Sequence, residues 1–313
     1  EDDANQALDK IRKSSFNISK IETKRVKRNP LAPFTTSTLQ QEASNKLGFG
    51  ASRTMRIAQK LYEGINIGSE TTGLITYMRT DGVQLSSQAI DELRNEITNR
   101  HGKDYIPQTP RVYKSKAANA QEAHEAIRPT SISRDPENMS QYLDNEQLKL
   151  YELIWKRTIS SQMQSAELDE TAADISNKDM SIIFRANGSQ VYFPGFFVYR
   201  DREDDKILPK LVENEDVDLE KADGEQHFTQ PPPRFTDASL IKKMEELGIG
   251  RPSTYASILQ VLINRSYVEK EKGKHIPQER GRILTAFLNN FFGQYIEYDF
   301  TADLEKKLDK VSD

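Results

Sequence analysis

The chain has 313 residues, a length that suggests about two domains. Its residues are 36% hydrophobic and 29% charged, which indicates a surface that is large relative to the hydrophobic core. The absence of cysteine excludes disulfides and cysteine-ligated zinc, and no apolar run approaches the roughly 18–20 residues of a membrane span, which excludes an integral membrane protein. A net charge of −4 is not typical of a generic nucleic-acid-binding domain, although it allows a local basic groove. Because the chain begins at Glu1 rather than methionine, we expect it to be a piece of a longer protein.

The opening segment is predicted to form a short helix and then a strand that carries a basic cluster. Asn29-Pro30 and Ala32-Pro33 then interrupt the chain, and we place a first boundary near Phe34. The basic cluster consists of Lys20, Lys24, Arg25, Lys27 and Arg28.

From there to about Met163 the apolar residues recur at helical spacing. Helix N-caps are predicted at residues whose side chains can accept a hydrogen bond from the first turn, and Gly48, Gly64 and Gly102 are suited to end helices. These caps are Ser37, Ser52, Ser86 or Ser87, and Asp144.

The pattern then changes to short segments rich in β-branched and aromatic residues. Asn187-Gly188 predicts a two-residue hairpin turn between strands at 182–185 and 191–199. This β region runs to about Thr229 and is predicted to join the opening strand, because the helical block looks inserted between them. Gln230-Pro231-Pro232-Pro233 is the clearest linker.

After the linker the order is helix, glycine turn, helix and hairpin, over about residues 240–276. That order is typical of a winged helix-turn-helix. Two further helices are predicted at 282–292 and 301–311.

One candidate for chemistry is the segment Leu74–Gly82, which contains Tyr77-Met78-Arg79-Thr80-Asp81. If it is extended, Tyr77, Arg79 and Asp81 face the same way, and the first two can reach one phosphate. A neighbouring guanidinium favours phenolate and stabilises charge on phosphate oxygens. The alternative is that these residues are simply good strand formers.

Two further segments could bind an anion. In the first, His124 could donate to a phosphate or relay a proton, and Arg128 could pair with an anion, or both could belong to an ordinary helix end. In the second, Arg251 precedes Ser253 and Thr254, either of which could cap a helix whose amides face a phosphate. An ordinary capped helix after a glycine turn is the alternative.

Asp216-Val217-Asp218-Leu219-Glu220 matches a D-x-D-x-E metal pattern, since a strand would place the three carboxylates on one face. Its acidic surroundings favour a solvated strand face instead. We therefore predict no metal site in this chain.

Taken together, the three candidate segments resemble the signatures of type IA DNA topoisomerases, most closely the bacterial topoisomerase I branch. The matching motifs are T-Y-M-R-T-D around Tyr77, A-H-E-A-I-R-P-T around His124 and G-I-G-R-P-S-T-Y-A-S-I around Arg251. They occur in the family's order and at similar spacing, and the resemblance covers essentially the whole chain.

The resemblance implies a role for each site residue. Tyr77 matches the nucleophile that forms a 5′-phosphotyrosyl link, Arg79 the arginine that positions the scissile phosphate, and His124 a histidine that supports the active site. Contacts to the DNA are expected from Arg79, Asp81, Arg128, Arg251, Ser253 and Thr254.

The resemblance also implies a multidomain α and β fold. A β-rich arch domain (1–34 and 165–230) would contain an inserted helical lid-like domain (35–164) that carries the tyrosine. A winged-helix-like domain, part of the family's base, would follow at 231–313.

The chain departs from the family pattern in two ways. Gly82 stands where a serine is common, which puts a hydroxyl contact in doubt. The family's Toprim domain, with its acidic Mg²⁺ cluster, has no match here, and neither do the C-terminal zinc ribbons. We therefore expect the Mg²⁺ ligands outside this chain.

The expected function is ATP-independent relaxation of negatively supercoiled DNA by transesterification and strand passage, with this fragment alone inactive. Expected partners are single-stranded DNA and negatively supercoiled duplex, and we expect a cytoplasmic, nucleoid-associated monomer. The alternatives are a regulator that reads duplex DNA through the winged helix, a phosphotyrosine-forming recombinase or nickase, and a structural scaffold.

Overall fold

The computed structural model of the chain describes residues 2–114, 124–200 and 205–312. The chain divides into two compact units, and each is made of two separate stretches of sequence. Residues 1–30 and 164–232 form the first unit, and residues 31–163 and 233–313 form the second. The three domain boundaries expected from the sequence, at 34/35, 164/165 and 230/231, stay a prediction.

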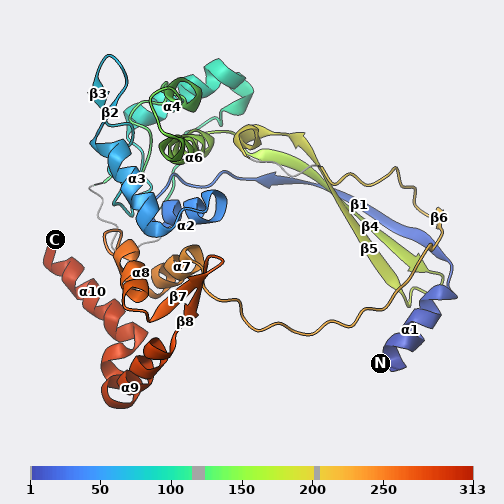
Figure 1. The fold of residues 1–313 in the computed structure, drawn as a ribbon. Coiled ribbons are helices and arrows are strands. Elements are labelled where there is room, and N and C mark those ends of the chain that lie inside the picture. The colour runs from blue at the N-terminus through green and yellow to red at the C-terminus, as the bar shows by residue number, and fades with distance from the viewer. Residues whose placement is uncertain (1, 115–123, 201–204, 313) are drawn as a thin grey trace. The chain divides into compact units, whose positions relative to one another are not determined.

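The first unit is a four-stranded antiparallel sheet in the order β5-β4-β1-β6, preceded by helix α1 (Asp2–Arg12) (Figure 1). The predicted pairing of the opening strand with the later β region is confirmed, because β1 and β4 pair from Phe16↔Asn177 to Arg28↔Ala166. A 3-10 helix, η2 (Gly195–Tyr199), lies between β5 and β6 along the chain. The strands are β1 (Phe16–Arg28), β4 (Ala166–Asn177), β5 (Ile183–Phe193) and β6 (Asp216–Val217).

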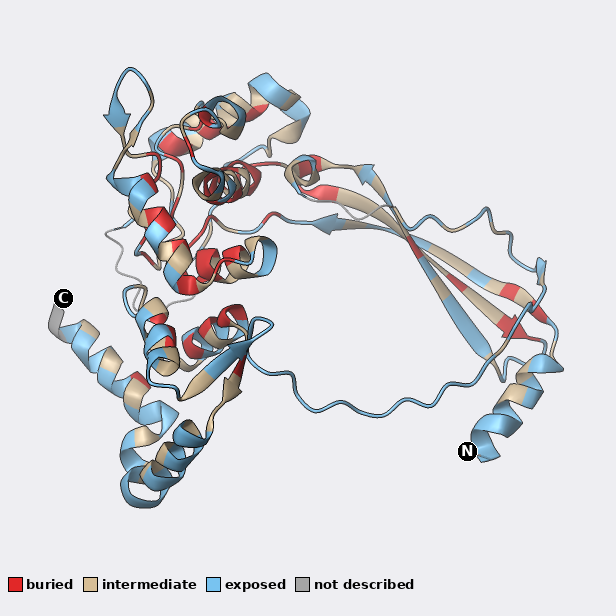
Figure 2. Cartoon of the chain, in the orientation of Figure 1, coloured by how far each residue is buried: buried red, intermediate tan, exposed pale blue. Residues whose placement is uncertain are grey.

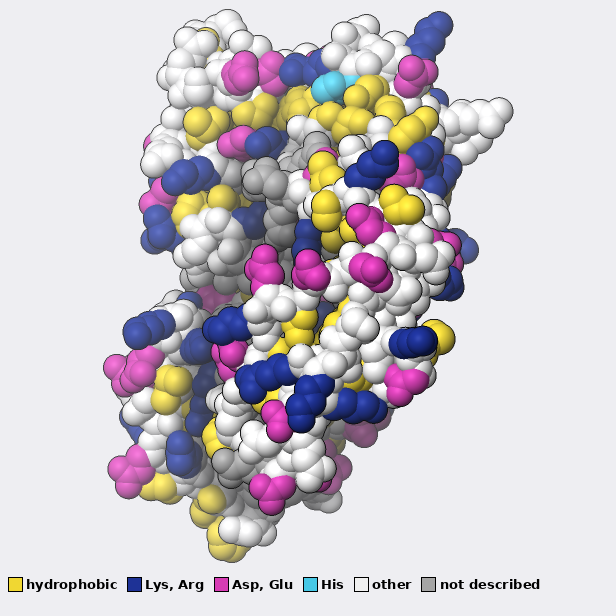
Figure 3. All heavy atoms as spheres, turned by 90° about the vertical axis from the view of Figure 1, so that its right-hand side faces the viewer, with side chains coloured by type: hydrophobic (Ala, Val, Ile, Leu, Met, Phe, Trp, Pro, Cys, Tyr) yellow, Lys and Arg dark blue, Asp and Glu magenta, His cyan; other side chains and the backbone are white. Residues whose placement is uncertain are grey.

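The basic cluster on β1 is matched by carboxylates, mainly on the neighbouring strand β4. Arg25 donates from Nε and Nη2 to Asp169, both at 2.9 Å, and Arg28 pairs with Glu170 at 2.5 Å. Acidic and basic side chains are also interspersed on the face shown in Figure 3. This cluster therefore does not form a basic groove. The remaining pairs are Lys20 and Lys24 with Glu22, and Lys27 with Glu167.

The hairpin turn predicted at Asn187-Gly188 is wrong. Strand β5 runs straight through both residues, which pair with Ala172 and Thr171 of β4. The turn lies instead between Asn177 and Ile183. Gly188 has a different reason to be glycine: a Cβ there would lie 2.8 Å from the carbonyl oxygen of Lys206 and 2.7 Å from Cγ of Leu208.

The second unit begins with the predicted helices. Ser86 caps α4 by accepting from the Ala89 N–H at 3.4 Å, and Asp144 caps α6 in a capping box with Gln147, as predicted. The caps predicted at Ser37 and Ser52 are wrong. Helix α2 begins two residues earlier, with a capping box between Thr35 and Thr38, and α3 begins after Gly50. The elements are α2 (Thr36–Leu47), α3 (Ala51–Glu63), β2 (Ile65–Asn66), β3 (Thr71–Thr72), α4 (Ser87–His101), η1 (Lys103–Tyr105), α5 (Pro136–Met139) and α6 (Asn145–Ser161).

Most of the buried side chains lie in the helices and loops of this unit (Figure 2). Helix α6 buries Leu150, Tyr151, Ile154 and Ile159 completely. The same core covers both sides of the segment around Tyr77, since Leu74, Ile75 and Met78 are at most 1% exposed. The core therefore holds the candidate nucleophile's neighbours and leaves Tyr77 itself half-buried.

The C-terminal part of this unit has helix, glycine turn, helix and hairpin in the predicted order. Gly248 ends α7 in the left-handed conformation, with φ 71°. Helix α9 contains a kink at Phe292. The predicted mixture of helices and antiparallel sheets is confirmed, and no helix within the described ranges is both long and apolar enough for a membrane span. The elements are α7 (Asp237–Leu247), α8 (Tyr255–Asn264), β7 (Val268–Glu271), β8 (Lys274–Pro277), α9 (Glu279–Ile296) and α10 (Tyr298–Ser312).

Candidate active site

The segment that carries Tyr77 is not a strand, contrary to the extended conformation considered from the sequence. It bends repeatedly, and only Ile75 forms a bridge, to Pro129. Burial nevertheless alternates along it: Met78, Thr80 and Gly82 are buried, whereas Tyr77 and Asp81 are half-buried and Arg79 is exposed. The three residues expected to share a face are thus the three that remain accessible.

Helix α2 holds this segment through the side chain of Thr36, which is fully buried. Its hydroxyl donates to the Met78 carbonyl at 2.7 Å and accepts from the Thr80 N–H at 2.8 Å. The Thr36 N–H donates to the Thr80 carbonyl, also at 2.8 Å. These bonds fix the backbone on both sides of Arg79 to the start of a helix, where unpaired N–H groups need partners.

The His124 segment holds the other side of Tyr77. Thr76 donates from its N–H to the Arg128 carbonyl at 2.9 Å and from its hydroxyl to the Ala126 carbonyl at 2.7 Å. The structure thereby brings together the two motifs around Tyr77 and His124. Ala123, the first residue of the latter motif, lies outside the described residues.

The ring of Tyr77 contacts two other rings. The Tyr62 ring from α3 contacts it nearly edge-on, with centroids 5.4 Å apart and planes at 66°, and the His124 ring lies 5.5 Å away on a tilted plane. His124 is exposed. Such aromatic contacts restrict a ring without burying its polar tip.

Arg79 is exposed and makes no hydrogen bond or ion pair with any residue that the structure describes. Its guanidinium is therefore available to an anion. Arg128 differs, because its Nε donates to Glu125 at 2.5 Å and its Nη1 to the Pro129 carbonyl at 2.9 Å. A contact from Arg128 to DNA would have to compete with Glu125.

Gly82 packs directly on the His124 backbone. A Cβ at Gly82 would lie 2.3 Å from the His124 carbonyl oxygen, a distance that requires one of the two segments to shift. The glycine at this position thus allows the close approach of the His124 segment. A serine could not replace it in this arrangement without movement.

Arg251 lies in the glycine loop between α7 and α8, and helix α10 supplies its acidic partners. Its Nε and Nη2 donate to Asp309 at 3.2 and 2.7 Å, and its Nη1 lies 2.6 Å from Oε2 of Glu305. The Asp309 hydrogen bond is the main reason that the pKa of Arg251 is raised above its usual value. Sequence reasoning missed Glu305 and Asp309, although their four-residue spacing in a predicted helix places them on one face.

Ser253 and Thr254 do not cap α8 with their side chains. Thr254 occupies the N-cap position, but its hydroxyl accepts from the Arg251 N–H at 2.8 Å instead. The N–H groups of Thr254 and Tyr255 both donate to the Arg251 carbonyl. These amides are already partnered, and Ser253 is exposed.

Asp81 connects the tyrosine segment to the Arg251 loop through its electrostatic surroundings. Its pKa is raised, chiefly by burial; Arg251 and His124 oppose this rise, and Asp309 adds to it. Charges shift a pKa mainly when they lie close to the titrating group. Residues from all three sequence motifs therefore share one electrostatic environment.

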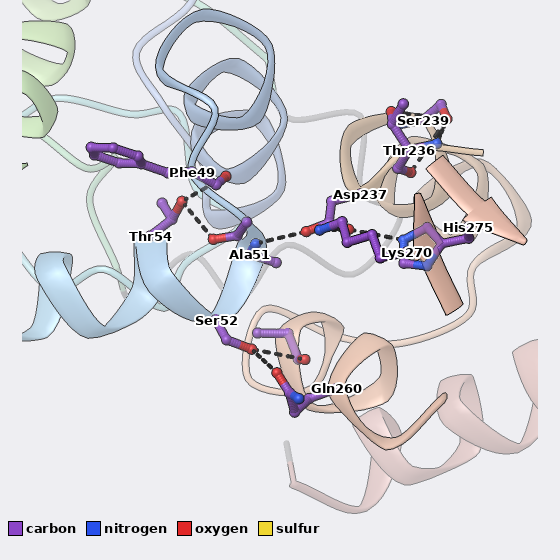
Figure 4. A network of polar contacts seen from close by, with 12 residues as sticks. Phe49, Ala51, Ser52, Thr54, Thr236, Asp237, Ser239, Gln260, Lys270 and His275 are labelled. Carbon is purple, nitrogen blue, oxygen red and sulfur yellow. Dashed lines mark hydrogen bonds and ion pairs between the residues drawn. The ribbon is translucent and has the colours of Figure 1, made fainter. Parts of the chain in front are cut away.

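A buried polar network joins the helical segment to the C-terminal segment of the same unit (Figure 4). Asp237, at the start of α7, is 4% exposed and accepts from the Ala51 N–H at 3.1 Å, from Lys270 Nζ at 2.8 Å and from His275 Nε2 at 2.8 Å. In effect, Asp237 caps α3, whose own N-cap, Gly50, has no side chain to do so.

Asp216, Asp218 and Glu220, the residues of the D-x-D-x-E pattern, are all exposed. Among the described residues no three His, Asp or Glu side chains are arranged to hold a metal ion. The donor set of the described residues does not fit Mg²⁺, so no step below passes through a metal.

The fold is that of a DNA topoisomerase. The family model described as DNA topoisomerase matches residues 1–313, and the chain belongs to that bacterial topoisomerase family. The resemblance to type IA topoisomerases inferred from the three motifs is thereby confirmed.

Individual relatives agree with this assignment. The chain is 53% identical to DNA topoisomerase 1 of Rickettsia felis over its full length, which is 41% of that protein. It is 51% identical to DNA topoisomerase 1 of Zymomonas mobilis over 99% of the chain and 25% of that protein. A crystal structure of full-length topoisomerase I from Thermotoga maritima matches 98% of the chain and half of its own, with a TM-score of 0.87 at 39% identity. The chain thus spans less than half the length of these two curated relatives.

Proposed function

We propose that this chain supplies the nucleophile and part of the phosphate-binding surface of an enzyme that relaxes negatively supercoiled DNA. The observation that carries the proposal is the half-buried Tyr77 ring, which lies beside His124 and two residues before the exposed Arg79. Because no described residue claims the Arg79 guanidinium, it can bind the phosphate that the Tyr77 hydroxyl attacks.

In the proposed reaction the Tyr77 Oη forms a bond to the phosphorus of one strand. The bond from phosphorus to the 3′ oxygen breaks, the 3′ oxygen leaves as a hydroxyl, and the 5′ phosphate stays on Tyr77. The tyrosine proton passes to a base outside this chain, and a donor outside it protonates the leaving oxygen. Religation reverses each transfer, so one phosphodiester is exchanged for another and no ATP is consumed.

Within the chain, His124 and Tyr62 restrict the Tyr77 ring, and the hydrogen bonds of Thr36 and Thr76 fix the backbone before and after it. We propose that Asp81, Arg251, Ser253 and Thr254 contact nucleotides on either side of the scissile phosphate. Arg128 would contribute only by leaving Glu125. Mg²⁺, with ligands in the part of the longer protein that this chain lacks, stays a prediction, as do the monomeric state, the cytoplasmic nucleoid location and the inactivity of the isolated chain.

The direct test is Tyr77→Phe in the longer protein, which removes the attacking oxygen and keeps the ring. We expect no relaxation of supercoiled plasmid and no covalent protein–DNA adduct, with single-stranded DNA binding retained. Tyr295→Phe is the matched control, because Tyr295 is 54% exposed on α9 and contacts Phe300 rather than the site. An adduct formed by Tyr77→Phe would place the nucleophile elsewhere.

A regulator that reads duplex DNA through the winged helix predicted at 240–276 is the alternative from another class. It requires base-specific protection of duplex DNA, whereas the proposed enzyme prefers single strands with little sequence information. Footprinting on duplexes of random sequence separates the two.

A further inference from the structure

Arg251 is held by helix α10 in a cluster that we name the Arg251 clamp, made of Arg251, Glu305 and Asp309. Nε of the guanidinium donates one hydrogen bond and Nη2 another, both to Asp309, and Nη1 donates two, to the carbonyls of Gly248 and Gly250. Four of its five N–H groups therefore have protein acceptors. Few N–H groups of this guanidinium fork are left to bind a phosphate.

The glycine loop is attached to the same helix. The Gly250 N–H donates to Oε1 of Glu305 at 2.9 Å, while Oε2 of that carboxylate faces Nη1 of Arg251 as an ion pair without an aligned hydrogen bond. Glu305 and Asp309 lie four residues apart on one face of α10 and are 22% and 28% exposed. The ion pairs of the clamp are thus partly shielded from water, unlike a fully exposed surface ion pair.

The charges of the clamp do not suit an incoming phosphate. Two carboxylates face one guanidinium, and Asp81 adds a third carboxylate within electrostatic reach of Arg251. A phosphate placed on Arg251 with both carboxylates in position would meet net negative charge. Binding requires at least one carboxylate to leave.

Resting on the proposed function, we propose that Glu305 and Asp309 are competitors of DNA for Arg251. In this arrangement they occupy the fork where a backbone phosphate would bind, and the phosphate takes over the fork by displacing Asp309. A guanidinium can bind either a carboxylate or a phosphate through two parallel hydrogen bonds. A phosphate can therefore replace the Asp309 carboxylate with the same hydrogen-bond geometry. The clamp would lower the affinity of the resting site for single strands.

Asp309→Asn in the longer protein tests the exchange. The variant keeps the side-chain shape and weakens the hold on Arg251, so we expect a short fluorescein-labelled single-stranded oligonucleotide to bind about two- to tenfold more tightly by anisotropy titration. Glu305→Gln should act in the same direction. Asp303→Asn is the matched control: it removes one negative charge from the same helix, but Asp303 is 67% exposed and pairs only weakly with Lys306, at 3.7 Å.

The double variant Arg251→Ala/Asp309→Asn decides whether the gain passes through Arg251. We expect it to bind no more tightly than Arg251→Ala alone. A gain that persists in the double variant, a gain no larger than that of Asp303→Asn, or weaker binding by Asp309→Asn would each overturn the exchange, the last by making Asp309 a positioning residue. If the wild-type protein binds no single strand, the proposed function fails as well; wild-type binding without the gain removes the clamp proposal alone. Circular dichroism melts confirm that every variant is folded.

Discussion

Tyr62 lies nearly edge-on to Tyr77, with ring centroids 5.4 Å apart and planes at 66°. The two residues come from different elements, since Tyr62 belongs to α3 and Tyr77 to the irregular segment that follows β3. The backbone reinforces the contact: the Leu74 N–H donates to the Leu61 carbonyl at 2.7 Å, and a Cβ at Gly73 would lie 2.5 Å from the Tyr62 carbonyl oxygen. Helix α3 therefore restricts the position of the Tyr77 ring.

Replacing Tyr62 by alanine should slow relaxation by about two- to tenfold, because an edge-on aromatic pair contributes about 0.5–1.5 kcal/mol and its loss frees the Tyr77 ring. Tyr62→Phe keeps the ring and should restore the wild-type rate. Both rates are measured on supercoiled plasmid with the longer protein. Equal loss in the two variants would mean that the Tyr62 hydroxyl, and not its ring, matters.

Asp237 makes the second unit sensitive to acid. Burial raises its pKa, but hydrogen bonds from His275 and Lys270, the charge of Lys270 and the Ala51 N–H together lower it to about 2. A depressed carboxyl pKa contributes stability above the unfolded value of 3.8 that is lost as the pH falls towards 2. The contribution at neutral pH is about 2 kcal/mol.

We therefore expect Asp237→Asn to lower the free energy of unfolding by about 2 kcal/mol at pH 7 and to cost progressively less between pH 4 and pH 2. Urea unfolding at several pH values measures this. The exposed Asp303→Asn serves as control and should change little at any pH. A penalty for Asp237→Asn that is the same at pH 7 and pH 3 would contradict the assignment of the charge.

Gly82→Ala should damage the site, since the added methyl group would lie 2.3 Å from the His124 carbonyl oxygen. Displacing the His124 segment should lower stability by about 1–3 kcal/mol and reduce relaxation. Gly293→Ala, where no atom lies within 4 Å of the new Cβ, is the matched control and should be neutral or stabilising. Full activity of Gly82→Ala would show that the His124 backbone does not need this close approach.

Much of the second unit follows from its sequence because the signals are local. Ser86 and Asp144 cap helices through side-chain acceptors, as their sequence positions predict. Burial alternates from Tyr77 to Gly82 as expected, although the segment does not form the strand from which that expectation was derived. The irregular backbone comes from long-range bonds, above all those of Thr36, which no local pattern announces.

Tertiary contacts also decide the residues that sequence reasoning missed. Glu305 and Asp309 can be recognised as partners of Arg251 only once α10 packs against the Arg251 loop. Likewise, the cap of α3 comes from Asp237, 186 residues away from Ala51. The basic cluster on β1 reads as a binding surface until β4 supplies Glu167, Asp169 and Glu170 beside it. A sequence shows which side chains carry charge, but only the folded structure shows which of them have an oppositely charged partner.

The clearest local signal that failed is Asn187-Gly188, and it makes a last prediction. Strand β5 continues through Gly188, and the 206–208 segment lies against it, with an antiparallel bridge between Ser189 and Lys206. The glycine therefore allows close packing and does not form a turn. Gly188→Ala should lower the stability of the first unit by about 1–3 kcal/mol, since the Lys206 carbonyl would lie 2.8 Å from the new Cβ. Asn187→Ala, which removes the other half of the supposed turn signal, should be nearly neutral, because Asn187 is an ordinary strand position paired with Ala172. Urea unfolding of both variants separates the two explanations: a turn would make both substitutions costly, whereas close packing makes only the glycine costly.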